Sequence, residues 1–204
     1  MPQSRRYKKK KSAGKAILAW IIVLAILAAG VFVFVSVFYE DAKKKLDEMN
    51  YPRTYSTYVE KAAKDYDLDP ALIYAVIHTE SGFDPKAESG VGAKGVMQMM
   101  PSSFEWLQEQ RGCAGQYTED DLFDPEICID YGSYLLKYFY DYYGTERSAI
   151  AAYNAGFVVS DWLNDTNYSS DGKNLDSIPY PETKNYVDKV ESAKEMYILS
   201  LIHI

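Results

Sequence analysis

The segment 69–82, DPALIYAVIHTESG, decides the fold class of this 204-residue chain. Asp69 stands directly before Pro70, which is the order of an N-cap residue and a first helical residue. The run that follows is strongly apolar and stops at Gly82, and glycine commonly terminates helices. The segment therefore predicts a short, very apolar helix that carries Glu80 at its C-terminal end.

The same start signal recurs further along the chain. Asp124 precedes Pro125, and apolar and aromatic residues then return every three to four positions until Gly144. Shorter helices are expected over 56–66, 102–110, 147–154 and 158–163, and a final one from about 181 to 197. Residues 83–100 hold three glycines and predict a loop or small hairpin. The sequence thus indicates a mostly α domain with a small loop or hairpin region.

One N-terminal segment has the length and composition of a transmembrane helix. Residues 16–39 contain 24 positions without a charge, and as a helix they would extend about 36 Å. A hydrocarbon layer is about 30 Å thick. A cleaved signal peptide is the alternative, but the apolar run VFVFVSVF at 31–38 follows the small residues where cleavage would require polarity. We therefore predict one uncleaved transmembrane helix.

The charges are divided between the two ends of the chain. Seven of the 22 Lys and Arg residues and none of the 29 Asp and Glu residues precede residue 40. The positive-inside bias places such a basic N-terminus in the cytoplasm and everything after the span outside. A nucleic-acid-binding tail is the alternative, but topology and anionic lipid account for the basic run. The acidic remainder would repel phosphates, so no nucleic-acid partner is expected.

Two cysteines, Cys113 and Cys128, follow the predicted span. An oxidising compartment permits a disulfide between them, and closing a loop of this size contributes about 3 kcal/mol in the chain-entropy model. Two independent buried thiols are the alternative. With His78 and His203 as the only histidines, the chain offers no recognisable four-ligand zinc set. We predict no metal site and no cofactor.

Several short motifs occur in a fixed order after the helix that carries Glu80. They are ESGFDP at 80–85, Ser89, GVMQMMP at 95–101, AYNAG at 152–156 and PYPETKNYV at 179–187. With these motifs the chain resembles the catalytic domain of the soluble lytic murein transglycosylases, a lysozyme-like, predominantly helical family. The resemblance spans about residues 55–198. Two positions depart from the family pattern, because Thr79 stands where a glutamine is common and Val96 where a leucine is common.

The resemblance implies cleavage of the β-1,4 bond between N-acetylmuramic acid and N-acetylglucosamine in peptidoglycan, with Glu80 as the single acid and base and a 1,6-anhydro product. A carboxyl group that donates a proton near neutral pH needs a raised pKa, which apolar surroundings supply. Ordinary glycosidases instead use two carboxylates. Asp84, Glu88 and Glu105 lie outside the motifs and are interpreted as solvated acids.

The resemblance also implies a set of substrate-binding residues beside Glu80. These are Ser81, Ser89, Gln98, Met100, Tyr153, Asn154 and Tyr186. In the family the tyrosine of the AYN motif steers the catalytic glutamate, which assigns that role to Tyr153. Met100 and Tyr186 suit the core equally well. A hydrolase that uses water, or a wall-binding scaffold without activity, are the alternative functions.

Together these inferences divide the chain into five parts. They are a cytoplasmic basic tail over 1–15, a transmembrane helix over 16–39, a stalk over 40–54, a catalytic domain over 55–198 and a C-terminal tail over 199–204. The expected partners are peptidoglycan strands on the wall side and the membrane, which the N-terminal helix would cross once.

Overall fold

The computed structural model describes residues 5–202, except for the side chains at 5–13, 40, 43–44, 46–48 and 201–202. The chain forms two compact units, Met1–Asn50 and Tyr51–Ile204. Residues 1–4 of the expected cytoplasmic tail and residues 203–204 of the expected C-terminal tail lie outside the described residues.

The first unit contains the single helix α1, Arg5–Asn50. Its portion Gly14–Tyr39 has a mean hydropathy of 3.0 and is long enough to cross a membrane. The helix continues through the charged residues that follow and ends directly before Tyr51 and Pro52. This end agrees with the exclusion of proline, and of the residue before it, from a helix interior.

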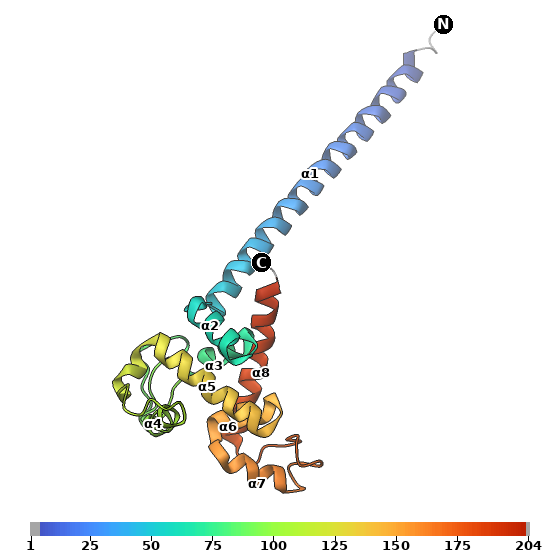
Figure 1. Cartoon of the computed structure of the whole chain (residues 1–204). Helices are drawn as coiled ribbons and strands as arrows, with labels where there is room; N and C mark the ends of the chain where they lie inside the picture. Colours follow the sequence, from blue (N-terminus) through green and yellow to red (C-terminus); the bar gives the residue numbers. More distant parts are fainter. Residues whose placement is uncertain (1–4, 203–204) are drawn as a thin grey trace. The chain divides into compact units, whose positions relative to one another are not determined.

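The second unit consists of helices joined by loops (Figure 1). Its elements are α2 (Ser56–Tyr66), α3 (Pro70–Ser81), α4 (Pro101–Gln110), the 3₁₀ helix η1 (Glu119–Phe123), α5 (Pro125–Tyr143), α6 (Glu146–Ala155), the 3₁₀ helix η2 (Gly156–Val158), α7 (Val159–Asn164) and α8 (Pro181–Ile202). Residues 5–202 form no strand, and isolated β-bridges join Glu88 to Lys94 and Lys94 to Met99. The expected mostly α fold with a small loop or hairpin region is confirmed.

The two helices that begin with Asp-Pro start as the sequence predicts. The Asp69 carboxylate accepts a hydrogen bond from the Ala71 N–H at 2.9 Å, and Asp124 accepts one from Glu126 at 2.9 Å. Gly82 ends α3 in the left-handed conformation, with φ of 60°. Local side-chain and backbone chemistry therefore fixes where α3 begins and ends.

Helix α3 lies at the centre of the second unit. Every residue from Ala71 to Ile77 is buried, which requires neighbours on all sides of the helix. Helix α8 covers one side with residues such as Val187, Val190 and Tyr197, and α2 also packs against α3. The last turn of α3 emerges from this core, and that turn carries Glu80.

The C-terminal helix is longer than expected. Helix α8 continues past Tyr197 to Ile202, so the described part of the expected C-terminal tail is helical. Tyr197 is fully buried, and its hydroxyl donates to the Pro52 carbonyl at 3.2 Å. Packing against the start of the second unit therefore holds this part of α8, which the local sequence pattern does not reveal.

The predicted disulfide is wrong, because both cysteines are free thiols. The Cys113 sulfur lies 3.3 Å from the Tyr131 hydroxyl. The Cys128 sulfur is fully buried and accepts a hydrogen bond from the Met97 N–H at 3.4 Å. Each sulfur therefore packs against a separate partner. Of the two independent thiols, Cys128 is buried as the alternative expected, whereas Cys113 is only half-buried.

Candidate active site

The site is built around Glu80, in the last turn of α3. Its side chain is half-buried, and its Oε1 accepts a hydrogen bond of 2.7 Å from the Tyr186 hydroxyl. Tyr186 is a buried residue of α8, 106 positions further along the chain. The packing of α8 on α3 therefore creates the contact that orients this carboxyl group.

The surroundings of Glu80 favour its neutral form. Burial raises the pKa of Glu80 to about 7, although the hydrogen bond from Tyr186 acts in the opposite direction. No basic side chain in the described part of the chain contributes to this pKa. Burial also raises the pKa values of Tyr186 and Tyr153, so both phenols remain protonated donors. Glu80 can thus hold a proton near neutral pH and release it.

Tyr153 makes its hydrogen bond to the segment 83–100 and not to Glu80. Its hydroxyl donates to the Met97 carbonyl oxygen at 2.9 Å. The direct hydrogen bond to Glu80 comes from Tyr186 instead. Tyr153 therefore fixes the backbone of the segment 83–100 beside the carboxyl group, and Tyr186 holds the carboxyl group itself.

Three of the predicted sugar-binding residues shape the segment 83–100. The Ser81 hydroxyl donates to the Val96 carbonyl at 2.8 Å. The Ser89 hydroxyl accepts from the Ala93 N–H at 2.9 Å.

Gln98 has a strained backbone, with φ of 47°. Its amide nitrogen donates to the carbonyls of Ala87 and Gly95, both at 3.0 Å. These hydrogen bonds leave the Gln98 side-chain oxygen and the Ser89 hydroxyl proton available to a ligand.

Some residues that pack against the segment 83–100 were not identified from the sequence. A Cβ at Gly95 would lie 1.9 Å from the Leu122 carbonyl oxygen, and one at Gly132 would lie 2.5 Å from the Met97 sulfur. Cys128 packs in the same place and accepts from the Met97 N–H. Gly95 belongs to a recognised motif, but nothing in the local sequence marks Gly132 or Cys128. Their role depends on contacts between distant segments.

The remaining predicted residues lie at the edges of the site. The Met100 side chain is 39% exposed at the start of α4. Asn154 is exposed and accepts a hydrogen bond from the Thr183 hydroxyl at 2.8 Å, which joins α6 to α8. The other acids considered from the sequence, Asp84, Glu88 and Glu105, are all exposed, and none contributes to the pKa of Glu80.

The site offers no obvious metal ligands. Within the described residues, no group of three or more His, Cys, Asp or Glu side chains is arranged to hold a metal ion.

Comparison with known proteins identifies the family of this unit. Residues 57–175 match the family described as the transglycosylase SLT domain, which is more than half of the chain. The chain belongs to this SLT family. The matched region includes Glu80, Gln98 and Tyr153, whereas Tyr186 lies beyond it.

The curated relatives of this SLT chain are longer proteins. It is 32% identical over 146 residues to the soluble lytic murein transglycosylase of Escherichia coli K12, covering 70% of this chain and 23% of that protein. It is 30% identical over 167 residues to the membrane-bound lytic murein transglycosylase C of Actinobacillus succinogenes, covering 71% of this chain and 47% of the relative. The chain thus spans about a quarter to a half of the length of these relatives.

Solved structures confirm the fold of the SLT unit. An inactive glutamate-to-glutamine mutant of the lytic transglycosylase Slt from Pseudomonas aeruginosa matches with a TM-score of 0.66 and 30% identity, covering 76% of this chain and 25% of that one. The 70 kDa soluble lytic transglycosylase of Escherichia coli matches with a TM-score of 0.68 and 28% identity, covering 76% and 26%. The lysozyme-like expectation is therefore confirmed.

Proposed function

We propose that the SLT unit cleaves the β-1,4 bond between N-acetylmuramic acid and N-acetylglucosamine in peptidoglycan and leaves 1,6-anhydro ends. The observation that carries this proposal is Glu80, a carboxyl group with a pKa near 7 and a neutral donor, Tyr186, on one oxygen. No other carboxylate in the described part of the chain contributes to that pKa. A reaction that needs one acid and base fits this arrangement better than one that needs two carboxylates.

The proposed reaction uses the Glu80 carboxyl group twice, first as an acid and then as a base. Protonated Glu80 donates to the glycosidic oxygen, and the bond from that oxygen to the muramoyl C1 breaks. The N-acetyl group of the substrate relieves the positive charge that develops at C1. The Glu80 carboxylate then removes the proton from the muramoyl C6 hydroxyl, whose oxygen bonds to C1 and closes the anhydro ring. Glu80 ends the cycle protonated, and no water is consumed.

The relatives support this proposal through the names they carry. The Escherichia coli and Actinobacillus relatives are named lytic murein transglycosylases. In the Pseudomonas structure, the protein with a glutamate changed to glutamine is described as inactive. These proteins extend well beyond the region they share with this chain. We therefore propose the cleavage reaction for the SLT unit alone, and not every activity of the longer relatives.

We further propose that α1 anchors the enzyme as a single-pass membrane protein. Gly14–Tyr39 is long and apolar enough to span a bilayer, and the basic residues before it favour a cytoplasmic N-terminus. The relative from Actinobacillus is named as membrane-bound. When the outer face of the membrane that α1 would cross is accessible, protease added to intact cells should digest the SLT unit. Digestion only after lysis would contradict this orientation.

The products of digestion decide the reaction type. The full chain in detergent micelles is incubated with purified peptidoglycan, and the soluble fragments are weighed by mass spectrometry. We expect anhydro-muropeptides, each lighter by one water than the product of hydrolysis. Reducing ends without anhydro products would instead identify a hydrolase of the lysozyme type.

A single variant distinguishes the proposed enzyme from a wall-binding scaffold without activity. Glu80→Gln keeps the shape of the side chain and removes the transferable proton. If cells that carry Glu80→Gln showed the same wall turnover and wall phenotype as the parent, binding alone would explain the function.

A further inference from the structure

The end of helix α8 carries apolar side chains that the SLT unit leaves uncovered. Ile198 and Leu199 are 36% and 52% exposed, and the helix then continues with serine, leucine and isoleucine to its last residue. Among residues 51–200, whose side chains are all described, Val91 is the one other exposed Val, Ile or Leu. Residues 198–202, which we call the apolar end of α8, are therefore available to a partner outside the unit.

Contacts within the SLT unit place this apolar end beside the first residues of the unit. The Tyr197 ring lies 5.5 Å from the Tyr51 ring, and the Tyr197 hydroxyl donates to the Pro52 carbonyl at 3.2 Å. Tyr51 directly follows Asn50, the last residue of α1. Tyr51 and Pro52 form the entry point of the chain into the SLT unit, and the apolar end of α8 starts one residue after Tyr197.

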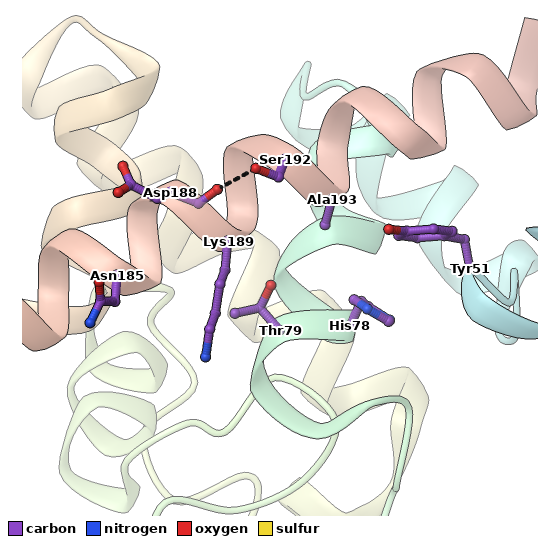
Figure 2. Close-up of a pocket in the computed structure, with 8 residues that line it drawn as sticks. All are labelled: Tyr51, His78, Thr79, Asn185, Asp188, Lys189, Ser192 and Ala193. Carbon is purple, nitrogen blue, oxygen red and sulfur yellow. Dashed lines mark hydrogen bonds between the residues drawn. The ribbon is translucent and has the colours of Figure 1, made fainter.

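Helix α8 runs toward this entry point from the proposed catalytic carboxyl group. Near the start of the helix Tyr186 binds Glu80 at 2.7 Å, and Tyr197 reaches the entry point about three turns later. In Figure 2, Asn185 and Tyr51 lie at opposite ends of the labelled residues, and α8 passes from the first toward the second. The apolar end of α8 thus extends away from Glu80 and past the place where the chain enters.

The length of the connection limits how far the entry point can lie from the bilayer that α1 is proposed to span. The apolar portion of α1 ends at Tyr39, and the helix continues to Asn50. As a helix, residues 40–50 extend about 17 Å, and any tilt brings Tyr51 closer to the hydrocarbon layer. Headgroups fill about 6 Å of that distance. The apolar end of α8 extends about 8 Å, so the bilayer surface is within its reach.

We infer that the apolar end of α8 binds the surface of the lipid bilayer that α1 crosses. Ile198 and Leu199 would lie at the boundary between headgroups and acyl chains. The last lysine of α8, Lys194, is already bound by Glu146 at 2.7 Å, so apolar side chains and not charge would carry the contact. The inference rests on the membrane anchor of the proposed function and not on the cleavage reaction. It would hold the SLT unit to the bilayer at two points and so limit the distance of Glu80 from it.

The test measures the depth of nitroxide labels on the full chain, reconstituted in phosphatidylcholine vesicles. Cys113→Ser removes the thiol that a labelling reagent could reach, and Cys128 is fully buried. Single labels are then attached to Leu199→Cys, to Val91→Cys and to Leu24→Cys. Val91 is the matched control because its side chain is 79% exposed, and Leu24 lies in the apolar portion of α1.

We expect the label at position 199 to be reached by oxygen, which concentrates in lipid, and to be shielded from a water-soluble nickel chelate. The ratio of oxygen to nickel accessibility should be severalfold higher at position 199 than at position 91. High salt should leave this ratio unchanged. Equal ratios at the two positions would overturn the inference. Dipolar broadening at position 199 that disappears on dilution with unlabelled chain would also overturn it, because a second copy would then occupy the surface.

A charge on the same surface tests whether apolar contact is responsible. With the label at Ile198→Cys, Leu199→Lys should lower the accessibility ratio to the value at position 91, because the ammonium group favours water. Val91→Lys is the control and should leave the ratio at position 198 unchanged. An unchanged ratio in Leu199→Lys would contradict an apolar contact with lipid.

The label at position 24 separates this inference from the proposed anchor. If the nickel chelate reached position 24, α1 would not span the bilayer, and the anchor would fail together with the inference. If position 24 lay in lipid while position 199 lay in water, the anchor would stand and only the contact of α8 would fail.

Discussion

Two carboxylates of the SLT unit, Glu80 and Asp130, each accept a hydrogen bond from a tyrosine. Glu80 accepts one from Tyr186, and Asp130 accepts one from Tyr66. Only Asp130 also has a cation, because Arg111 binds it at 2.6 Å. The phenol is common to both places, but Asp130 is part of an ion pair, whereas Glu80 is a carboxyl group whose pKa is raised by burial.

The surroundings of the two groups reinforce this difference. The Arg111 guanidinium lies 4.3 Å from the ring of Tyr131 and 4.5 Å from that of Tyr134, so its charge is held in place by aromatic faces. Near Glu80 lie Tyr153 and Cys128, and burial raises the pKa of both, to about 12 for the Cys128 thiol. Both remain neutral at working pH, which leaves Glu80 without a compensating charge.

The largest expected effect comes from removing the proton of Glu80. Glu80→Gln should lower kcat by about 10³-fold, equivalent to about 4 kcal/mol, because general acid and base catalysis is lost while the side-chain shape is kept. Steady-state release of anhydro-muropeptides measures the change. Asp130→Asn should leave kcat of the folded protein unchanged. An equally large loss of kcat in Asp130→Asn would contradict the different roles assigned to the two carboxylates.

The same Glu80→Gln variant should be more stable than the parent at high pH. The folded pKa of Glu80 is raised from 4.5 to about 7, so the folded state resists ionisation. The cost is absent below pH 4.5, grows as the pH rises to about 7, and is complete above it, where it reaches about 3 kcal/mol. Urea denaturation at pH 4 and pH 8 measures it. A stability gain independent of pH would contradict the raised pKa.

Removing the cation from Asp130 should instead lower stability. Arg111→Met leaves a partly buried carboxylate with only Tyr66 as a partner and removes the contact with two rings, so the free energy of unfolding should fall by about 2 kcal/mol. Chemical denaturation at pH 7 measures the change. Lys61→Met is the control, because the Lys61–Asp65 pair is exposed and should contribute less than about 1 kcal/mol.

The smallest effect tests the phenol at Glu80. Tyr186→Phe removes a hydrogen bond that favours the ionised carboxylate, so the pKa of Glu80 should rise and the high-pH limb of kcat/KM should move to higher pH. The maximum rate should fall by about tenfold, as expected for a lost hydrogen bond to a charged group.

Tyr143→Phe is the matched control for this variant. The Tyr143 hydroxyl contacts Ser160 at 3.1 Å, away from Glu80, so its removal should not move the limb. A rate loss in Tyr186→Phe without any movement of the limb would show that Tyr186 only supports the packing of α8.

Much of the fold follows from local sequence. The Asp-Pro starts of α3 and α5 and the glycine stops after them are set by side-chain caps and backbone freedom within a few residues. The apolar run of α1 is equally local. Local sequence does not predict the extension of α8 to Ile202, because Tyr197 packs against residues near Pro52 that are distant in the chain. The disulfide prediction is wrong because it used only the expected compartment and the spacing of the two cysteines. Neither reveals which way the two thiols point in the folded chain.

The sequence by itself determined the helix that carries Glu80, the motifs beside it and the apolar segment before them, because caps, periodicity and composition act over short distances. The tertiary structure decided which phenol binds Glu80 and which carboxylate receives Arg111. These features depend on side chains that are brought together from positions as far as 106 residues apart. The pKa of a carboxyl group is set by such neighbours and by burial, and neither is written in the residues adjacent to it in the chain.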